Sequence, residues 1–207
     1  MDDIRDMIAA ERAALAGVLA ELPASRWQEP TLCGGWRVKE VVAHITMPFR
    51  YSGPRFFLEL AKSRGNVNAM SDRRARHDAS VLSADQLTAA VADNVRHPWK
   101  PPGGGFLGAL THDVIHGLDI TVPLGIERTV PADRLGAILP GLESPKTLRF
   151  FGVDLSGVEL RATDSEFRFG SGSPVSGTTQ HQVLVLCGRK LPKGLLEGEV
   201  SGRFTAA

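Results

Sequence analysis

The sequence is poor in cysteine and has no excess of charge of either sign. Its 207 residues include two cysteines, Cys33 and Cys187, and neither belongs to a Cys-x-x-Cys pair. A disulfide framework is therefore excluded, and a reducing, cytoplasmic location is predicted. Lysine and arginine number 24 against 23 acidic residues, for a formal net charge of +1. That balance predicts no nucleic-acid partner, because it provides no basic surface to meet phosphate groups.

Long apolar runs are also missing. No run approaches the ~20 residues that a membrane-spanning helix needs, so we expect no membrane partner. The N-terminal segment mixes charged and apolar residues and lacks the hydrophobic region of a signal peptide. A GxSxG element is absent, and Gly103-Gly104-Gly105 is not followed by the Lys-Ser/Thr of a phosphate loop. What is present is 43% hydrophobic residues, enough for a substantial core.

The first two thirds of the chain have the spacing of helices. Apolar residues recur there every three or four positions, and Ser83 and Gln86 form a capping box at one helix start. The polar, arginine-rich stretch 63–80 is predicted to be a loop. The predicted helices cover residues 4–22, 38–45, 56–60, 83–95, 106–120 and 132–139.

Beyond about residue 143 the pattern changes to alternation. Apolar and polar residues alternate over 158–162 and again over 166–169, which predicts two strands joined by a turn at 163–165. A short helix over 182–186, ended by Gly188, follows. We therefore predict an α+β protein with a helical bundle over 1–142 and a small α+β domain over 143–207.

Two histidines lie four residues apart in the helix predicted over 106–120. His112 and His116 share one face of that helix, and Asp119 follows on the same side. This spacing allows two imidazoles to hold one metal ion, with Asp119 accepting the second ring N–H of a ligand. The alternative is a solvated pair of histidines, because such spacing alone proves little.

A third ligand has to come from another helix. His44 lies at the edge of an apolar stripe, where a side chain can reach a neighbouring helix. The alternative is a core histidine whose ring nitrogens are satisfied by hydrogen bonds. The other histidines are weaker candidates, and both cysteines are interpreted as structural. These residues are His77, His97, His181, Cys33 and Cys187.

Two segments together resemble a known family. Residues 31–44, TLCGGWRVKEVVAH, resemble the segment of the mycothiol-dependent maleylpyruvate isomerase family that holds a cysteine, Gly-Trp and a histidine eight residues further on. Residues 111–120, followed by Pro-Leu-Gly, resemble the family's second metal segment. Parts of 160–189 resemble its small C-terminal domain. The family belongs to the DinB/YfiT-like metalloenzymes, so the resemblance implies an N-terminal DinB-like four-helix bundle.

The resemblance implies that His44, His112 and His116 form a metal triad. Zinc suits three neutral imidazoles, with nickel or cobalt as alternatives. The maleylpyruvate isomerase itself is expected to have a glutamate at the position of His112, so this chain is closer in its ligands to the DinB/YfiT side. The family's thiol-binding arginine is not placed, and Arg189 and Arg203 are the candidates.

These observations predict a divalent-metal-dependent enzyme that uses mycothiol or a similar low-molecular-weight thiol. Its partners are this thiol and a small electrophile, its reaction an isomerisation or an S-transfer, and its assembly a monomer or homodimer. Asp119 is expected to accept a hydrogen bond from the second ring nitrogen of a ligating histidine. Two alternatives remain open, a metal-dependent hydrolase and a non-catalytic module that binds a small ligand or a partner.

Overall fold

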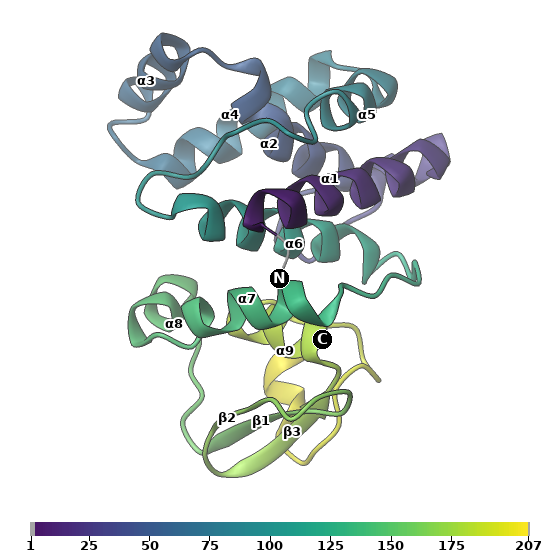
Figure 1. Cartoon of the computed structure of the whole chain (residues 1–207), viewed down its shortest axis with the longest axis vertical. Helices are drawn as coiled ribbons and strands as arrows, with labels where there is room; N and C mark the ends of the chain where they lie inside the picture. The colour runs from purple at the N-terminus through teal and green to yellow at the C-terminus, as the bar shows by residue number, and fades with distance from the viewer. Residues whose placement is uncertain (1–2, 207) are drawn as a thin grey trace. The chain divides into compact units, whose positions relative to one another are not determined.

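A computed structural model describes residues 3–206 and confirms the α+β class (Figure 1). Within these residues the chain forms nine α-helices and one three-stranded sheet. It divides into two compact units, one up to His116 and one from Gly117 onward. The predicted domain limits, 1–142 and 143–207, stay a prediction. Among the described residues, every helix is too short or too polar to cross a membrane.

The first unit is helical, and the predicted helices correspond to those observed. α2 packs against α4 and α5, and α1 packs against α5. The capping box of Ser83 and Gln86 starts α5 as predicted, and Pro48 lies in the last turn of α2. The elements are α1 (Ile4–Glu21), the 3-10 helix η1 (Ala24–Gln28), α2 (Val38–Arg50), α3 (Gly53–Lys62), α4 (Val67–Val81), α5 (Ala84–Ala92) and α6 (Gly105–Thr121), which continues into the second unit.

The prediction of a loop over 63–80 is wrong. α4 occupies most of this stretch, and Asn66 caps it by accepting a hydrogen bond from the Ala69 amide at 2.9 Å. The helix buries Met70, Arg74 and Asp78, which are spaced four residues apart on one face. Because two of these three buried positions are charged, apolar periodicity does not reveal the buried face.

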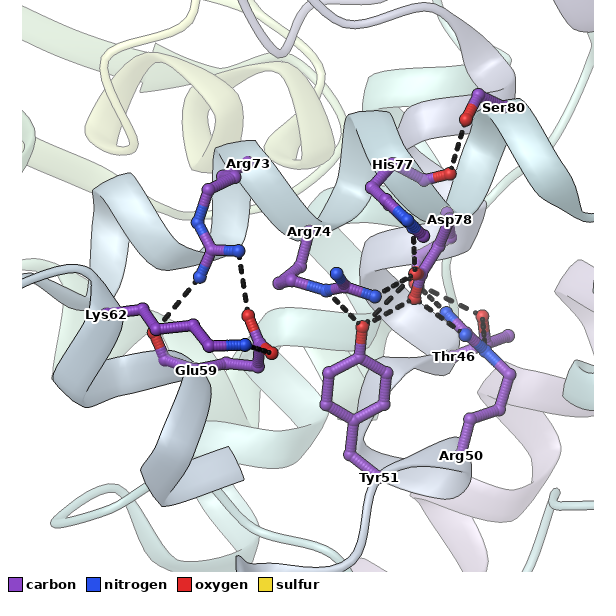
Figure 2. A network of polar contacts seen from close by, with 11 residues as sticks. Thr46, Arg50, Tyr51, Glu59, Lys62, Arg73, Arg74, His77, Asp78 and Ser80 are labelled. Atoms are coloured by element: carbon purple, nitrogen blue, oxygen red, sulfur yellow. Dashed lines mark hydrogen bonds and ion pairs between the residues drawn. The ribbon is translucent and has the colours of Figure 1, made fainter. Parts of the chain in front are cut away.

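Polar contacts from α2 and the residue that follows it compensate the buried charges of α4 (Figure 2). The Asp78 carboxylate accepts hydrogen bonds from Arg50 and Arg74 at 2.7 Å each and from the Tyr51 hydroxyl at 2.9 Å. Buried charge is tolerated only where partners satisfy it, and here three donors converge on one carboxylate. This network therefore joins α4 to α2 where an apolar core would otherwise do so.

The second unit contains the small sheet. β1 (Val158–Ala162) is central, antiparallel to β2 (Arg168–Gly170) and parallel to β3 (Ser173–Gly177). β1 and β2 confirm the predicted strands, while β3 was missed because its sequence, SPVSG, lacks apolar alternation. The remaining elements are α7 (Ala132–Leu142), α8 (Pro145–Phe151), α9 (Thr179–Leu186) and η2 (Ser201–Phe204). α9 packs on β1 and α7, and Gly188 follows it with φ of +72°, as predicted for a helix end.

Candidate metal centre

Helix α2 places His44 at the edge of a fully buried face. Val41, Val42 and Ile45 are at most 1% exposed, whereas His44 is partly buried. Glu40 anchors the start of the helix, because its carboxylate accepts hydrogen bonds from the backbone N–H and the Nε of Arg37 at 2.9 and 3.0 Å. The position of His44 therefore follows from the packing of α2 rather than from a flexible loop.

Helix α6 supplies the other two imidazoles. Leu110, Val114 and Leu118 form an apolar stripe along this helix and are completely buried. His112 and His116 lie on another face and are also partly buried. The helix is therefore contacted on more than one side, and the histidine face meets α2 instead of open solvent.

The three imidazoles converge. The Nε2 atoms of His44 and His112 are 3.1 Å apart, and the ring centroids of the three pairs lie 4.6 to 5.1 Å apart. One ring nitrogen from each of the three histidines lies within 4.8 Å of the other two. Two nitrogens that share a tetrahedral zinc ion at ~2.05 Å are about 3.3 Å apart, so this spacing suits a common ion.

The electrostatics favour a neutral His44. Burial lowers the pKa of His44 well below its ordinary value, and the neighbouring His116 and His112 lower this pKa further. The Nδ1 atom of His44 is buried and, within residues 3–206, lacks a hydrogen-bond partner. A neutral imidazole has one unprotonated ring nitrogen, and this is the atom that binds a metal.

A buried ion pair lies behind His112. Asp113 Oδ1 is 3.0 Å from His112 Nδ1, and the other carboxylate oxygen accepts a hydrogen bond from Arg12 Nε at 2.7 Å. The side chains of Arg12 and Asp113 are 0% and 2% exposed. Neither residue was predicted from the sequence, since Asp113 lies outside the face shared by His112 and His116 and Arg12 is 101 positions away.

Asp119 was the predicted carboxylate partner of a ligating histidine. The structure places its fully buried carboxylate in a two-point pair with Arg189, at 2.7 and 2.8 Å. The hydrogen-bond partner of His112 Nδ1 is instead Asp113. A role for Asp119 toward the histidines stays a prediction, and Arg189 is held in a defined orientation by it.

Two tryptophans flank the histidines. The Trp99 ring lies 5.0 Å from that of His112, and the Trp36 ring lies 5.1 Å from that of His44. Trp36 is fixed in turn, because its indole N–H donates to Asp72 at 2.8 Å. These rings form apolar walls that restrict how the imidazoles can turn.

The two cysteines have different surroundings. Cys33 is partly buried, and its Sγ lies within 4.8 Å of a ring nitrogen of His116. Cys187 is buried, and this burial raises the pKa of its thiol to about 12. The interpretation of Cys187 as an inert core residue fits this environment, while Cys33 lies at the edge of the histidine cluster.

The remaining histidines have other contacts. His77 Nδ1 is 3.3 Å from Asp78, and the His97 ring packs at 5.0 Å from that of Phe49. His181 lies on α9. Among the described residues, the three-histidine group with mutually close ligand atoms is formed by His44, His112 and His116, and their role as metal ligands stays a prediction.

Comparison with known proteins adds a family and a fold. A sequence model of the mycothiol maleylpyruvate isomerase N-terminal domain matches residues 8–121. Two uncharacterized proteins of Mycobacterium tuberculosis, from strains CDC 1551 and H37Rv, are each 26% identical over 167 residues, or 70% of this chain. The match spans 61% of the length of these relatives.

Solved structures extend the likeness to nearly the whole chain. Crystal structures of the mycothiol-dependent maleylpyruvate isomerase and of a histidine-to-alanine mutant of it match with TM-scores of 0.55 and 0.53. Each covers 97% of both chains at 16% sequence identity. The sequence model confirms the predicted family resemblance. The solved structures, at this identity, confirm only the fold class.

Proposed function

Because the chain belongs to the mycothiol maleylpyruvate isomerase N-terminal domain family, we propose that it is a divalent-metal-dependent enzyme that uses a mycothiol-type thiol. The observation that supports this most directly is the convergence of His44, His112 and His116, whose ligand atoms lie within 4.8 Å of one another. The proposed reaction is an isomerisation or an S-transfer on a small electrophile.

The three histidines fit a divalent transition-metal ion or zinc. Three imidazoles are neutral ligands, so they suit zinc, nickel or cobalt better than magnesium or calcium. Three protein ligands also leave a coordination position open, which is the arrangement of catalytic rather than structural zinc sites. When bound, such an ion lowers the pKa of a coordinating thiol and so supplies a thiolate at neutral pH.

The chain's own residues do the remaining work. His44, His112 and His116 would bind the ion through their ring nitrogens. Trp36 packs against the ring of His44 and Trp99 against the ring of His112. In an isomerisation, the thiolate sulfur adds to one carbon of an activated double bond. The carbon–carbon bond is then single and rotates, and the double bond re-forms as the same thiolate leaves. In an S-transfer, the sulfur instead displaces a leaving group that departs with the bonding electron pair.

Metal content is the first test. We expect protein purified without chelator or nickel resin to contain about one zinc per chain, and His116→Ala to lose it. The matched control is His77→Ala, since His77 is exposed and lies outside the cluster. A wild-type chain without metal affinity would contradict the proposal and favour the non-catalytic binding module.

Thiol binding is the second test. We expect mycothiol to raise the Tm of the zinc-loaded protein, because a ligand that binds only the folded state stabilises it. Bacillithiol and glutathione serve as comparison thiols, and metal-free protein serves as the control. Zinc binding without a response to any of these thiols would favour the metal-dependent hydrolase instead.

A further inference from the structure

The ion pair of Arg12 and Asp113 contacts the candidate metal site through one ring nitrogen of His112. His112 presents Nε2 to His44 at 3.1 Å and Nδ1 to the Asp113 carboxylate at 3.0 Å. Arg12 binds the other carboxylate oxygen at 2.7 Å and also donates to the His97 carbonyl at 2.8 Å. The Asp113 carboxylate is thus held from both sides.

We propose that Arg12 and Asp113 are positioning residues that keep His112 in the tautomer with its Nε2 lone pair directed at the metal site. The metal in this inference rests on the proposed function, whereas the tautomer of His112 does not depend on it. An ionised carboxylate only accepts hydrogen bonds, so the ring proton of a neutral His112 must lie on Nδ1. Nε2 is then the ligand atom, as in other sites where a carboxylate orients a metal-binding histidine.

Arg12 has a separate part in this arrangement. A lone carboxylate with 2% exposure would be costly to bury in charged form, and the guanidinium at 2.7 Å compensates that charge. The pair is neutral as a whole, so it orients His112 without cancelling the charge of a bound cation. A positive metal with three neutral ligands then retains its attraction for an anionic thiolate.

The competing explanation is that the pair merely joins α1 to α6. Under that explanation, its loss would lower stability but would leave the His112 tautomer and metal affinity unchanged. The packing of Arg12 over the Phe49 ring, 4.9 Å from the centroid, shows that the side chain also has structural contacts. The test must therefore measure the His112 tautomer and the metal affinity, which a purely structural contact would not change.

Asp113→Asn separates the two explanations. Arg12 requires an acceptor, so it should keep the new amide oxygen and turn the amide NH2 toward His112 Nδ1. The ring would then have to accept at Nδ1 and carry its proton on Nε2, which blocks the ligand atom. We expect zinc affinity, measured by chelator competition, to fall about 10- to 100-fold.

A double variant provides the rescue. In Arg12→Met combined with Asp113→Asn, no guanidinium competes for the amide oxygen, which can turn to accept from His112 Nδ1. We expect this double variant to bind zinc more tightly than Asp113→Asn alone. A purely structural pair predicts no such recovery. The double variant also removes both buried charges together, so it leaves no uncompensated ion in the core.

The matched control is Asp78→Asn. Asp78 is an equally buried carboxylate, 3% exposed and paired with arginines in the network of Figure 2. Its side-chain contacts are with Arg50, Tyr51, Arg74 and His77 rather than with the three clustered histidines. We expect it to lower stability while leaving zinc affinity within about twofold of the wild type.

The tautomer is read directly from ¹⁵N chemical shifts of His112 in the metal-free protein. We expect Nδ1–H in the wild type and in the double variant, and Nε2–H in Asp113→Asn. An Nε2–H tautomer in the wild type, or an Asp113→Asn variant with unchanged zinc affinity, would overturn this inference alone. A wild type that binds no zinc would overturn the proposed function together with it.

Discussion

The Nε2 atoms of His44 and His112 lie 3.1 Å apart although 68 positions separate the two residues in the chain. Their approach depends on α2 and α6, each held by a buried apolar face. Because rigid helices and not loops position these atoms, the site is largely formed before any ligand binds.

Tryptophan fluorescence should report metal binding. Trp99 lies 5.0 Å from His112 and Trp36 lies 5.1 Å from His44, so a paramagnetic ion held by these histidines lies close to two indoles. We expect Co²⁺ to quench the emission saturably at one equivalent. Trp99→Phe should reduce the quenched fraction, and His116→Ala should abolish saturation at that stoichiometry. Equal quenching in wild type and His116→Ala would contradict this prediction.

Alkylation should distinguish the two thiols. At pH 8 a thiol with a pKa of about 12 is only about 0.01% ionised, and Cys187 is also buried. We expect iodoacetamide to modify Cys33 and spare Cys187 in the folded protein, as measured by peptide mass spectrometry. Because Cys33 lies within 4.8 Å of a His116 nitrogen, zinc should slow its modification. Rapid labelling of Cys187 in native protein would refute the assignment.

Acid should weaken the contacts of Glu59. Hydrogen bonds from Lys62 and Arg73 lower the pKa of Glu59 from its ordinary value near 4.5 to about 2. The resulting stabilisation is complete above the unfolded pKa and is lost as the pH falls from about 5 through 2.

Glu59→Gln tests this dependence. We expect the variant to lose about 1 kcal/mol of unfolding free energy at pH 7, a small amount because the side chains of Lys62 and Arg73 are 53% and 42% exposed. The difference between variant and wild type, measured by urea unfolding, should shrink at pH 2. A difference of the same size at both pH values would contradict the assignment.

The buried network around Asp78 should dominate the charge contribution to stability. Asp78→Asn leaves Arg50 and Arg74 without their shared carboxylate, and we expect a loss of about 3–5 kcal/mol in unfolding free energy. Asp6→Asn is the comparison, since its pair with Arg96 is exposed and worth at most about 1 kcal/mol. Similar losses in the two variants would show that burial does not govern these pairs.

Local pattern was sufficient for much of the fold. The capping box at Ser83 depends on residues within one turn of one another, and it is observed. The same is true of the placement of His112 and His116 on one helical face. His44 was found at the edge of an apolar stripe, a position that follows from helical periodicity alone.

The sequence by itself therefore determined the class of fold and the main helices, and its resemblance to a known family pointed to the three histidines. Only the tertiary structure decided that Asp113 is hydrogen-bonded to His112, that Cys33 lies beside His116, and that 67–81 is helical. Each of these features involves a partner far away in the chain. Arg12 binds Asp113, α6 brings His116 to Cys33, and Arg50 and Tyr51 bind Asp78 on the helix over 67–81. Spacing within one helix predicts which face a side chain occupies, but the charge or ring that meets it is set by packing between helices.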